Sequence, residues 1–158
     1  MNVLFCSFTI LKNKNNLNEF LRNVEILMNL EKSYSLFQLV KTMNFMGLQY
    51  KDLYSANSEI KSLYKENTNV LSYYVIKTIL MSNYPAFLSW CATNNKSLLQ
   101  FNKTIVNQSK YCDYIEKHYK SKSMLDGVKY ASRLLTNKKT NTDKFLLVNM
   151  RMSLCELG

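Results

Sequence analysis

The chain has 158 residues, which suits one domain with a buried core, and 47% of the residues are hydrophobic. Its formal net charge is +10, and the excess lies in the second part: residues 61–158 hold fifteen basic and six acidic groups, whereas residues 1–60 hold six and five. This imbalance favours a polyanionic partner, nucleic acid before an anionic membrane. No run approaches the ~20 apolar residues of a membrane span, and residues 3–11 lack the basic start of a signal peptide, so we expect a cytoplasmic protein.

The first third of the chain is predicted to form a short strand and two helices. Residues 4–10 alternate between apolar and polar side chains, a period of two that indicates a strand. After a polar break the apolar period becomes helical, with Asn16 as an N-cap. Ser33 or Ser35 can cap a second helix, which should stop near Gly47 because glycine readily adopts the left-handed conformation after a helix. We expect these two helices to pack as a hairpin.

The middle of the chain is predicted to be helical throughout. Residues 48–66 form one kinked helix or two short ones, and residues 70–81 are apolar enough on most sides to form a central buried helix. Pro85 lies in the first turn of a short following helix, where its missing N–H is least costly. We expect Trp90, in that short helix, to lie in the core.

Residues 96–122 are predicted to form one long helix with two different faces. Apolar residues spaced by three, four and seven form one stripe: Leu98, Phe101, Ile105, Cys112, Ile115 and Tyr119. Four lysines recur every seven residues on the face that points away from this stripe: Lys96, Lys103, Lys110 and Lys117. The lysine row contacts either RNA or solvent, and the spacing alone does not decide between them.

The last part of the chain is predicted to contain one more helix and a terminal strand. Ser121 or Ser123 can cap the helix. Residues 148–154 alternate in polarity, which favours a strand, with a helix as the alternative. Paired with residues 4–10, this strand would form a small antiparallel ribbon. The predicted fold class is therefore α+β: a mainly α-helical single domain, residues 1–158, with a small antiparallel β-ribbon from the terminal segments.

The chain offers few groups for catalysis or metal binding. Cys6, Cys91, Cys112 and Cys155 form no CxxC pair and are accompanied by a single histidine, so we expect reduced thiols and no zinc site. His118 follows Cys112 by six residues, about 240° around a helix, so the two do not face each other as base and nucleophile. Three glycines leave no phosphate-binding loop. We therefore predict a protein that is not an enzyme and that has no catalytic residues, metal or cofactor.

Basic and aromatic residues interleave in the second part of the chain, a pattern typical of single-stranded RNA binding. The cations would contact phosphates, and the tyrosine rings would lie under splayed bases. The predicted RNA-binding residues are Lys110, Lys117, Lys120, Lys122, Lys129, Arg133, Lys138, Lys139, Lys144, Arg151, Tyr111, Tyr119 and Tyr130. Each tyrosine can equally be a core residue with a solvated hydroxyl. No RNP, KH or zinc-finger sequence is present to identify a particular module.

Two stretches resemble the N-terminal RNA-binding domain of rotavirus non-structural protein 3. The first is Met46-Gly-Leu-Gln-Tyr50 followed by Leu53-Tyr54, which is similar to the family's Met-Gly-Ile-Gln-Tyr stretch and the helix after it. The second is Leu125-Asp-Gly-Val128 with Arg133-Leu-Leu135, which is similar to the family's Leu-Asp, Val and Met-Met-Leu run. Thr68-Asn-Val70 stands where the family has Asp-Ser-Gly-Val, which places the resemblance with a divergent rotavirus group.

The resemblance implies a homodimer that binds the single-stranded 3′ end of viral mRNA in a basic tunnel and promotes viral translation in the host cytoplasm. It also implies that residues 1–158 are the N-terminal part of a longer protein, whose C-terminal half would form a coiled coil and bind the host translation-initiation scaffold. Two alternatives stay open. One is a viral helical bundle that presents an apolar groove near Trp90 to a host regulatory helix. The other is a protein that coats RNA without sequence preference.

Overall fold

The computed structural model describes residues 7, 10, 16–55, 68–97, 100–137 and 148. The predicted helical stretch that follows residue 55 lies outside the described residues. The same holds for two of the cysteines and four of the predicted RNA-binding residues: Cys6, Cys155, Lys138, Lys139, Lys144 and Arg151. The predictions made for these residues therefore stay predictions.

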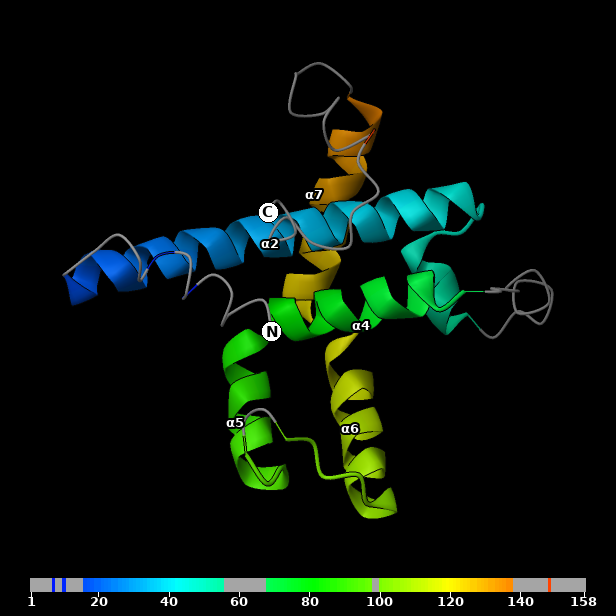
Figure 1. Cartoon of the computed structure of the whole chain (residues 1–158). Coiled ribbons are helices and arrows are strands. Elements are labelled where there is room, and N and C mark those ends of the chain that lie inside the picture. The colour runs from blue at the N-terminus through cyan, green and yellow to red at the C-terminus, as the bar shows by residue number, and fades with distance from the viewer. Residues whose placement is uncertain are drawn as a thin grey trace.

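The first long element is α2, Leu17–Phe45, which runs for 29 residues. Asn16 caps its start as predicted, because its side-chain oxygen accepts the backbone N–H of Asn18 at 3.0 Å. The predicted hairpin of two helices is wrong, since one continuous helix replaces it. The buried residues of α2 all lie between residues 31 and 43, and in Figure 1 the N-terminal half extends beyond the rest of the bundle.

The second helix start was predicted wrongly because neither serine hydroxyl is available to cap a helix. Ser33 Oγ donates to the carbonyl of Asn29, one turn earlier in α2, at 2.8 Å. Ser35 Oγ shares a hydrogen bond of 2.9 Å with Thr78 Oγ1, which belongs to α4. Serine hydroxyls that bond to the preceding turn or to another helix are compatible with a helix interior. The hydroxyls that the sequence offered as caps are therefore used for different contacts.

The end of α2 near Gly47 is confirmed. Gly47 has a φ of 69°, in the left-handed region, and its N–H donates to the carbonyl of Asn44 at 3.1 Å. The N–H of Leu48 donates to the carbonyl of Met43 at 2.8 Å. These two bonds form a Schellman motif, which satisfies carbonyls that the helix end leaves unpaired. The chain then turns into η1, the 3-10 helix Tyr50–Tyr54.

Replacing Gly47 with Ala is expected to lower the free energy of unfolding by about 1–2 kcal/mol, because a residue with a Cβ is strained in the left-handed region. A Cβ at this position would meet no atom within 4 Å, so the loss would come from the backbone conformation and not from a clash. Urea unfolding followed by circular dichroism measures the change. Gly47→Asn is the matched control and should lose less, since Asn tolerates this conformation better. Equal losses for Ala and Asn would contradict this explanation.

The next two helices follow the predicted pattern. α4, Val70–Ser82, and α5, Tyr84–Asn94, are separated only by Asn83. Pro85 lies in the first turn of α5 as predicted. The prediction that Trp90 lies in the core is wrong, because its indole is only half-buried.

α6, Ile105–His118, is shorter than the predicted helix over residues 96–122. It starts at Thr104, whose hydroxyl accepts the backbone N–H of Asn107 at 3.3 Å. Asn107 Nδ2 also donates to a carbonyl of the preceding loop at 2.9 Å, so this polar side chain is buried. Ile105 is instead 85% exposed. The predicted apolar stripe therefore has the wrong phase as well as the wrong length.

The last described helix is α7, Lys122–Thr136. Of the two predicted caps, Ser121 is the one used: its Oγ accepts the backbone N–H of Met124 at 3.3 Å. The buried face of α7 consists of Met124, Val128 and Ala131. The exposed basic residues of α7, Lys122, Lys129 and Arg133, lie on the side of the helix opposite this buried face.

The predicted β-ribbon is wrong. The described residues contain no strand, only an isolated bridge between Ser97 and Gln100. Ser7, Ile10 and Val148, which lie in or at the edge of the two segments predicted as strands, are helical. Apolar residues in such short runs fit a strand and a helix almost equally well, so periodicity could not decide between them. The described part of the chain is mainly α-helical.

Figure 1 shows how the helices are arranged. α4 lies along α2, and α7 crosses and contacts both helices. α5 and α6 extend together from the side of α4 that faces away from α2. The core lies between α2, α4 and α7 and includes Leu39, Met43, Leu71, Ile79 and Met124. None of the described helices is both long enough and apolar enough to cross a bilayer.

α7 lies against α2 at Gly127. A Cβ added there would lie 2.8 and 3.0 Å from the two terminal methyl carbons of Leu36, a buried residue of α2. These distances are shorter than ordinary carbon contacts, so the glycine permits the close approach of the two helices.

Gly127→Ala is expected to lower the free energy of unfolding by up to about 2 kcal/mol. Overpacking in a core costs about 1–3 kcal/mol, and the better helix propensity of Ala offsets about 1 kcal/mol of this. In a Leu36→Ala background the clash is absent, so the same substitution should become stabilising. A double-mutant cycle measured by urea unfolding gives the coupling between the two positions. A coupling near zero would show that Gly127 is not needed for the helix contact.

Candidate nucleic-acid interface

A cleft of about 570 Å³ lies between the C-terminal end of α2, η1 and α7, and we refer to it as the α2–α7 cleft. Its volume falls in the range of small-molecule and nucleotide sites. Its apolar floor is Val40, Met43, Leu48, Leu125 and Val128. Its remaining lining residues are polar, aromatic or basic: Asn44, Gln49, Tyr50, Lys51, Tyr54, Lys129, Ser132, Arg133 and Thr136.

Three cations line the α2–α7 cleft, and no described carboxylate does. Lys129 and Arg133 are four residues apart on α7, so helical geometry places both on one face. Lys51 reaches the cleft from η1 on the other side. All three side chains are exposed, and none forms an ion pair with a described residue. The cleft therefore has a positive potential that no described acidic group neutralises.

The nearest acidic residue on η1 is turned toward the backbone. Asp52 Oδ2 accepts the backbone N–H of Gln49 at 2.7 Å, which closes a capping box at the start of η1. The local sequence thus holds Asp52 at the start of η1, and Lys51 but not Asp52 lines the cleft.

Tyrosines form one wall of the α2–α7 cleft. Tyr50 is only 6% exposed, and its hydroxyl donates to the carbonyl of Tyr119 at 2.5 Å, which joins η1 to the end of α6. Burial raises the pKa of Tyr50, and the neighbouring Tyr54 and Tyr119 raise it further, so its hydroxyl stays protonated. Tyr54 is 38% exposed and contacts both rings edge-on, at centroid distances of 6.2 and 5.8 Å. Its ring is therefore fixed in place but still accessible.

Lys120 lies at the rim of this wall. Its ammonium is 4.6 Å from the ring centroid of Tyr54 and 5.1 Å from that of Tyr119, which is the geometry of a cation–π contact. A side-chain hydrogen bond with Tyr119 raises the pKa of Lys120, and Lys120 is exposed. Lys120 is thus a charged group that a phosphate at the rim could reach.

The structure brings together only part of the predicted RNA-binding set. Lys129 and Arg133 line the α2–α7 cleft. Tyr119 and Lys120 do not line it, but both contact the ring of Tyr54, which does. Lys122 lies about two helical turns before Lys129, so both side chains are on the same face of α7. Tyr130 is 60% exposed and does not line the cleft. Lys110, Tyr111 and Lys117 belong to α6 and do not line it either.

The contribution of η1 was not predicted from the sequence. Lys51 and Tyr54 lie in the first part of the chain, where basic and acidic residues nearly balance, so no excess of charge marks them. A basic residue between two tyrosines, just after a glycine-terminated helix, is the signal that could have found them. Asn44 and Gln49, which offer hydrogen bonds to base edges, were missed for the same reason.

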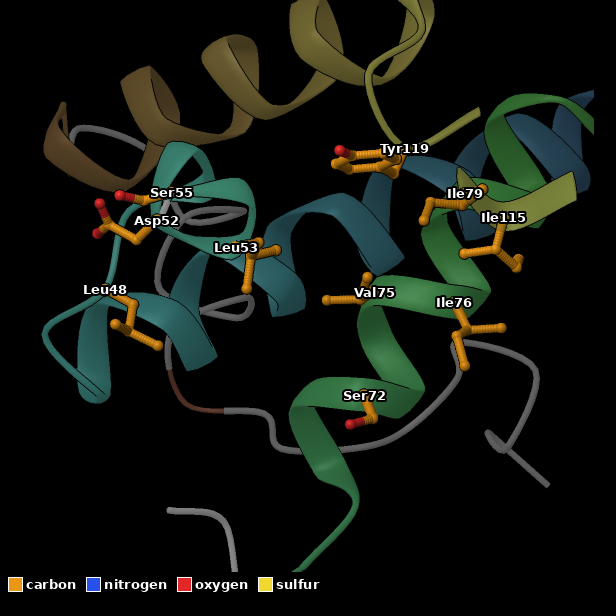
Figure 2. A pocket seen from close by; sticks show the side chains of 10 residues that line it. All are labelled: Leu48, Asp52, Leu53, Ser55, Ser72, Val75, Ile76, Ile79, Ile115 and Tyr119. Atoms are coloured by element: carbon orange, nitrogen blue, oxygen red, sulfur yellow. The ribbon is translucent and has the colours of Figure 1, made fainter. Parts of the chain in front are cut away.

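A separate groove of about 450 Å³ lies between η1, α4 and α6 (Figure 2). Its walls are mostly apolar and include Leu53, Val75, Ile76, Ile79 and Ile115. Leu53 belongs to η1, Val75, Ile76 and Ile79 belong to α4, and Ile115 belongs to α6 (Figure 2). The alternative function, binding of a host regulatory helix, predicted an apolar groove near Trp90. An apolar groove is present, but Trp90 does not line it.

The fold and the cleft define a class: a mainly helical protein with a basic, tyrosine-lined cleft. Among the described residues there is no group of three His, Cys, Asp or Glu side chains that could hold a metal ion. A scan against protein-family models and searches of curated proteins and of solved structures each found no match to this chain.

Proposed function

We propose that this protein binds single-stranded RNA in the α2–α7 cleft and does not catalyse a reaction. The observation that supports this most directly is the convergence of Lys51, Lys129 and Arg133 on one cleft that no described carboxylate lines. Residues from η1 and α7 are far apart in sequence, so their convergence is a property of the fold and not of lysine-rich composition.

The chemistry of the cleft suits an unpaired nucleotide. Cations on both sides can contact successive phosphates, and the accessible ring of Tyr54 can stack on a base, a contact worth about 1–3 kcal/mol per base. The amides of Asn44 and Gln49 can bond to base edges that pairing would otherwise hide. A duplex would keep those edges and ring faces covered, so the cleft favours a single strand.

The finer identity of the RNA rests on the resemblance to the rotavirus family. It gives the 3′ end of viral mRNA as the ligand, a homodimer as the binding form, and promotion of viral translation in the host cytoplasm as the outcome. The host translation-initiation scaffold would be bound by a region beyond residue 158.

Fluorescence anisotropy with a labelled RNA dodecamer tests the proposal. We expect the single strand to bind more tightly than a duplex of the same sequence, and its log affinity to fall with log salt by about 0.7 for each phosphate contact. Competition between a viral 3′-terminal oligonucleotide and a scrambled one separates end-specific binding from RNA coating. Absence of binding at low salt, or equal affinity for single strand and duplex, would refute the proposal.

The apolar groove of Figure 2 favours one second candidate, a protein that binds a host regulatory helix. An amphipathic helix places apolar side chains at spacings of three, four and seven, which suits a groove lined by Leu53, Ile76 and Ile115. Ile76→Ser would weaken such a complex and leave RNA affinity unchanged. RNA binding that responds to this substitution as strongly as to cleft substitutions would argue against two separate sites.

A further inference from the structure

A third cavity, a hollow of about 450 Å³, lies between α5 and α6. We refer to it as the α5–α6 hollow. It is lined by Trp90, Lys110, Asp113, Tyr114, Lys117 and His118. Ala86 lines it too, and its small side chain leaves open the space that a larger residue one turn before the indole would fill. None of these residues lines the α2–α7 cleft or the apolar groove.

The aromatic side of the hollow is rigid. The indole of Trp90 is nearly parallel to the rings of Phe87 and Phe101, each at a centroid distance of 6.2 Å, and Tyr111 meets it edge-on at 5.6 Å. Because these rings are already ordered, a flat ligand that stacks here would lose little side-chain entropy. The half-buried indole can therefore act as a preformed surface for a base.

The polar aromatic groups beside the indole are also held. Tyr114 donates its hydroxyl to the carbonyl of Asn83 at 3.2 Å, and the ring of His118 lies 4.3 Å from the ring of Tyr114. Burial lowers the pKa of His118, and the adjacent Lys117 lowers it further, so the imidazole is neutral near pH 7. His118 thus adds a flat hydrogen-bonding ring and not a third cation.

Two cations and one carboxylate lie on the open side of the hollow. Lys110 and Lys117 are two turns apart on α6, a rise of about 10.5 Å, and neither forms an ion pair with a described residue. Asp113 lies between them in sequence, on the same side. The lysines suit the phosphates of a strand, and the carboxylate can accept a hydrogen bond from a base amino group, as acidic side chains do from cytosine.

We propose that the α5–α6 hollow is a second contact site for the RNA strand held in the α2–α7 cleft, and that it takes a base with an exocyclic amino group. This inference rests on the proposed function. Lys117 and His118 are followed directly by Tyr119 and Lys120, which contact Tyr54 in the wall of the cleft, so a strand that leaves the cleft over this turn can continue along α6.

The chain contains one tryptophan, so Trp90 reports on this hollow alone. Labelled dodecamers of oligo(C) and oligo(U) measure total binding by anisotropy, while quenching of Trp90 emission by acrylamide measures access to the hollow. We expect bound oligo(C) to protect Trp90 and to bind roughly fivefold or more tightly than oligo(U), which lacks an amino group. Asp113→Ala should remove this preference without reducing the affinity for oligo(U).

The surface variant Lys110→Gln/Lys117→Gln should abolish the protection of Trp90 and lower the salt slope by about 0.7 for each phosphate that a lysine no longer binds, while the cleft still binds RNA. If the dodecamer binds but Trp90 stays equally accessible, or if protection persists in this variant, the inference is overturned and the proposed function stands. If no dodecamer binds, both fall together. A trimer that binds in the cleft without protecting Trp90 would support two sites joined by one strand.

Discussion

Lys77→Met is expected to lower the free energy of unfolding by about 3–5 kcal/mol, the largest loss we expect from a single substitution. Lys77 Nζ donates to Glu31 Oε1 at 2.5 Å, between α4 and α2. Glu31 is fully buried and Lys77 is 9% exposed. Removing the ammonium takes a cation away from a fully buried carboxylate, and a buried charge is poorly solvated inside a protein.

The matched control is the double variant Glu31→Leu/Lys77→Met. It removes both charges, so we expect its stability to equal or exceed that of the original chain, as is common when apolar side chains replace a buried ion pair. Urea unfolding of the two single variants and the double variant gives the coupling free energy. A Lys77→Met variant within about 0.5 kcal/mol of the original chain would mean that solvent or another group compensates the charge of Glu31.

This ion pair matters for the site because it helps set the register of α2 on α4. The hydrogen bond between Ser35, one turn after Glu31 on α2, and Thr78, the residue after Lys77 on α4, belongs to the same contact. Polar pairs inside an apolar interface disfavour shifted packings, since a shift would leave them unpaired. The position of α2 in turn places η1, and with it Lys51, opposite α7. We therefore expect the double variant to be stable. We also expect its RNA affinity to be heterogeneous, because its molecules would no longer share a single register of α2 on α4.

Reversing the three cleft charges, Lys51→Glu/Lys129→Glu/Arg133→Glu, is expected to weaken RNA binding by on the order of 100-fold. Each charge-assisted hydrogen bond to a phosphate is worth about 1 kcal/mol or more, and 1.4 kcal/mol is tenfold in affinity. The slope of log affinity against log salt should also fall by about 0.7 for each phosphate that the variant no longer binds. Anisotropy with the labelled dodecamer measures both quantities.

The control for this variant has the same change in net charge at exposed positions that do not line the cleft: Arg22→Glu/Lys96→Glu/Lys103→Glu. It should weaken binding only slightly and leave the salt slope nearly unchanged, because distant exposed charges are screened within about 10 Å at 0.1 M salt. Both triple variants should keep the helical circular dichroism spectrum, since every substituted side chain is exposed. Equal losses in the two variants would show that net charge, and not the cleft, determines affinity.

Capping and helix-end residues in the sequence predicted much of the helical structure. Asn16, Gly47, Pro85 and Ser121 each mark a helix end by contacts within a few residues, and each lies where it was expected. Such signals depend on hydrogen bonds between near neighbours in the chain, so they can be interpreted without the fold. The helix α4, with its long apolar run, was predicted for the same reason.

Other features depended on contacts between distant residues, and the sequence misled there. Ser33 or Ser35 was expected to cap a second helix, but the partner of Ser35 is Thr78 of another helix. The start of α6 was missed although its contacts are local, because a heptad count over residues 96–122 tests apolar spacing and not the capping bond from Asn107 to Thr104. The alternating terminal segments fitted a strand and a helix almost equally, and their described residues are helical.

The amino-acid sequence by itself determined the excess of positive charge, its concentration in the second part of the chain, and the ends of several helices. Only the tertiary structure decided which cations meet. Lys51 lies in the same cleft as Lys129 and Arg133 because α2, which packs on α4 and α7, places η1 opposite α7. Lys110 and Lys117 line the α5–α6 hollow instead. The physical reason is that charge is a property of each residue, whereas a binding surface needs groups far apart in the chain to be held at fixed distances by packing.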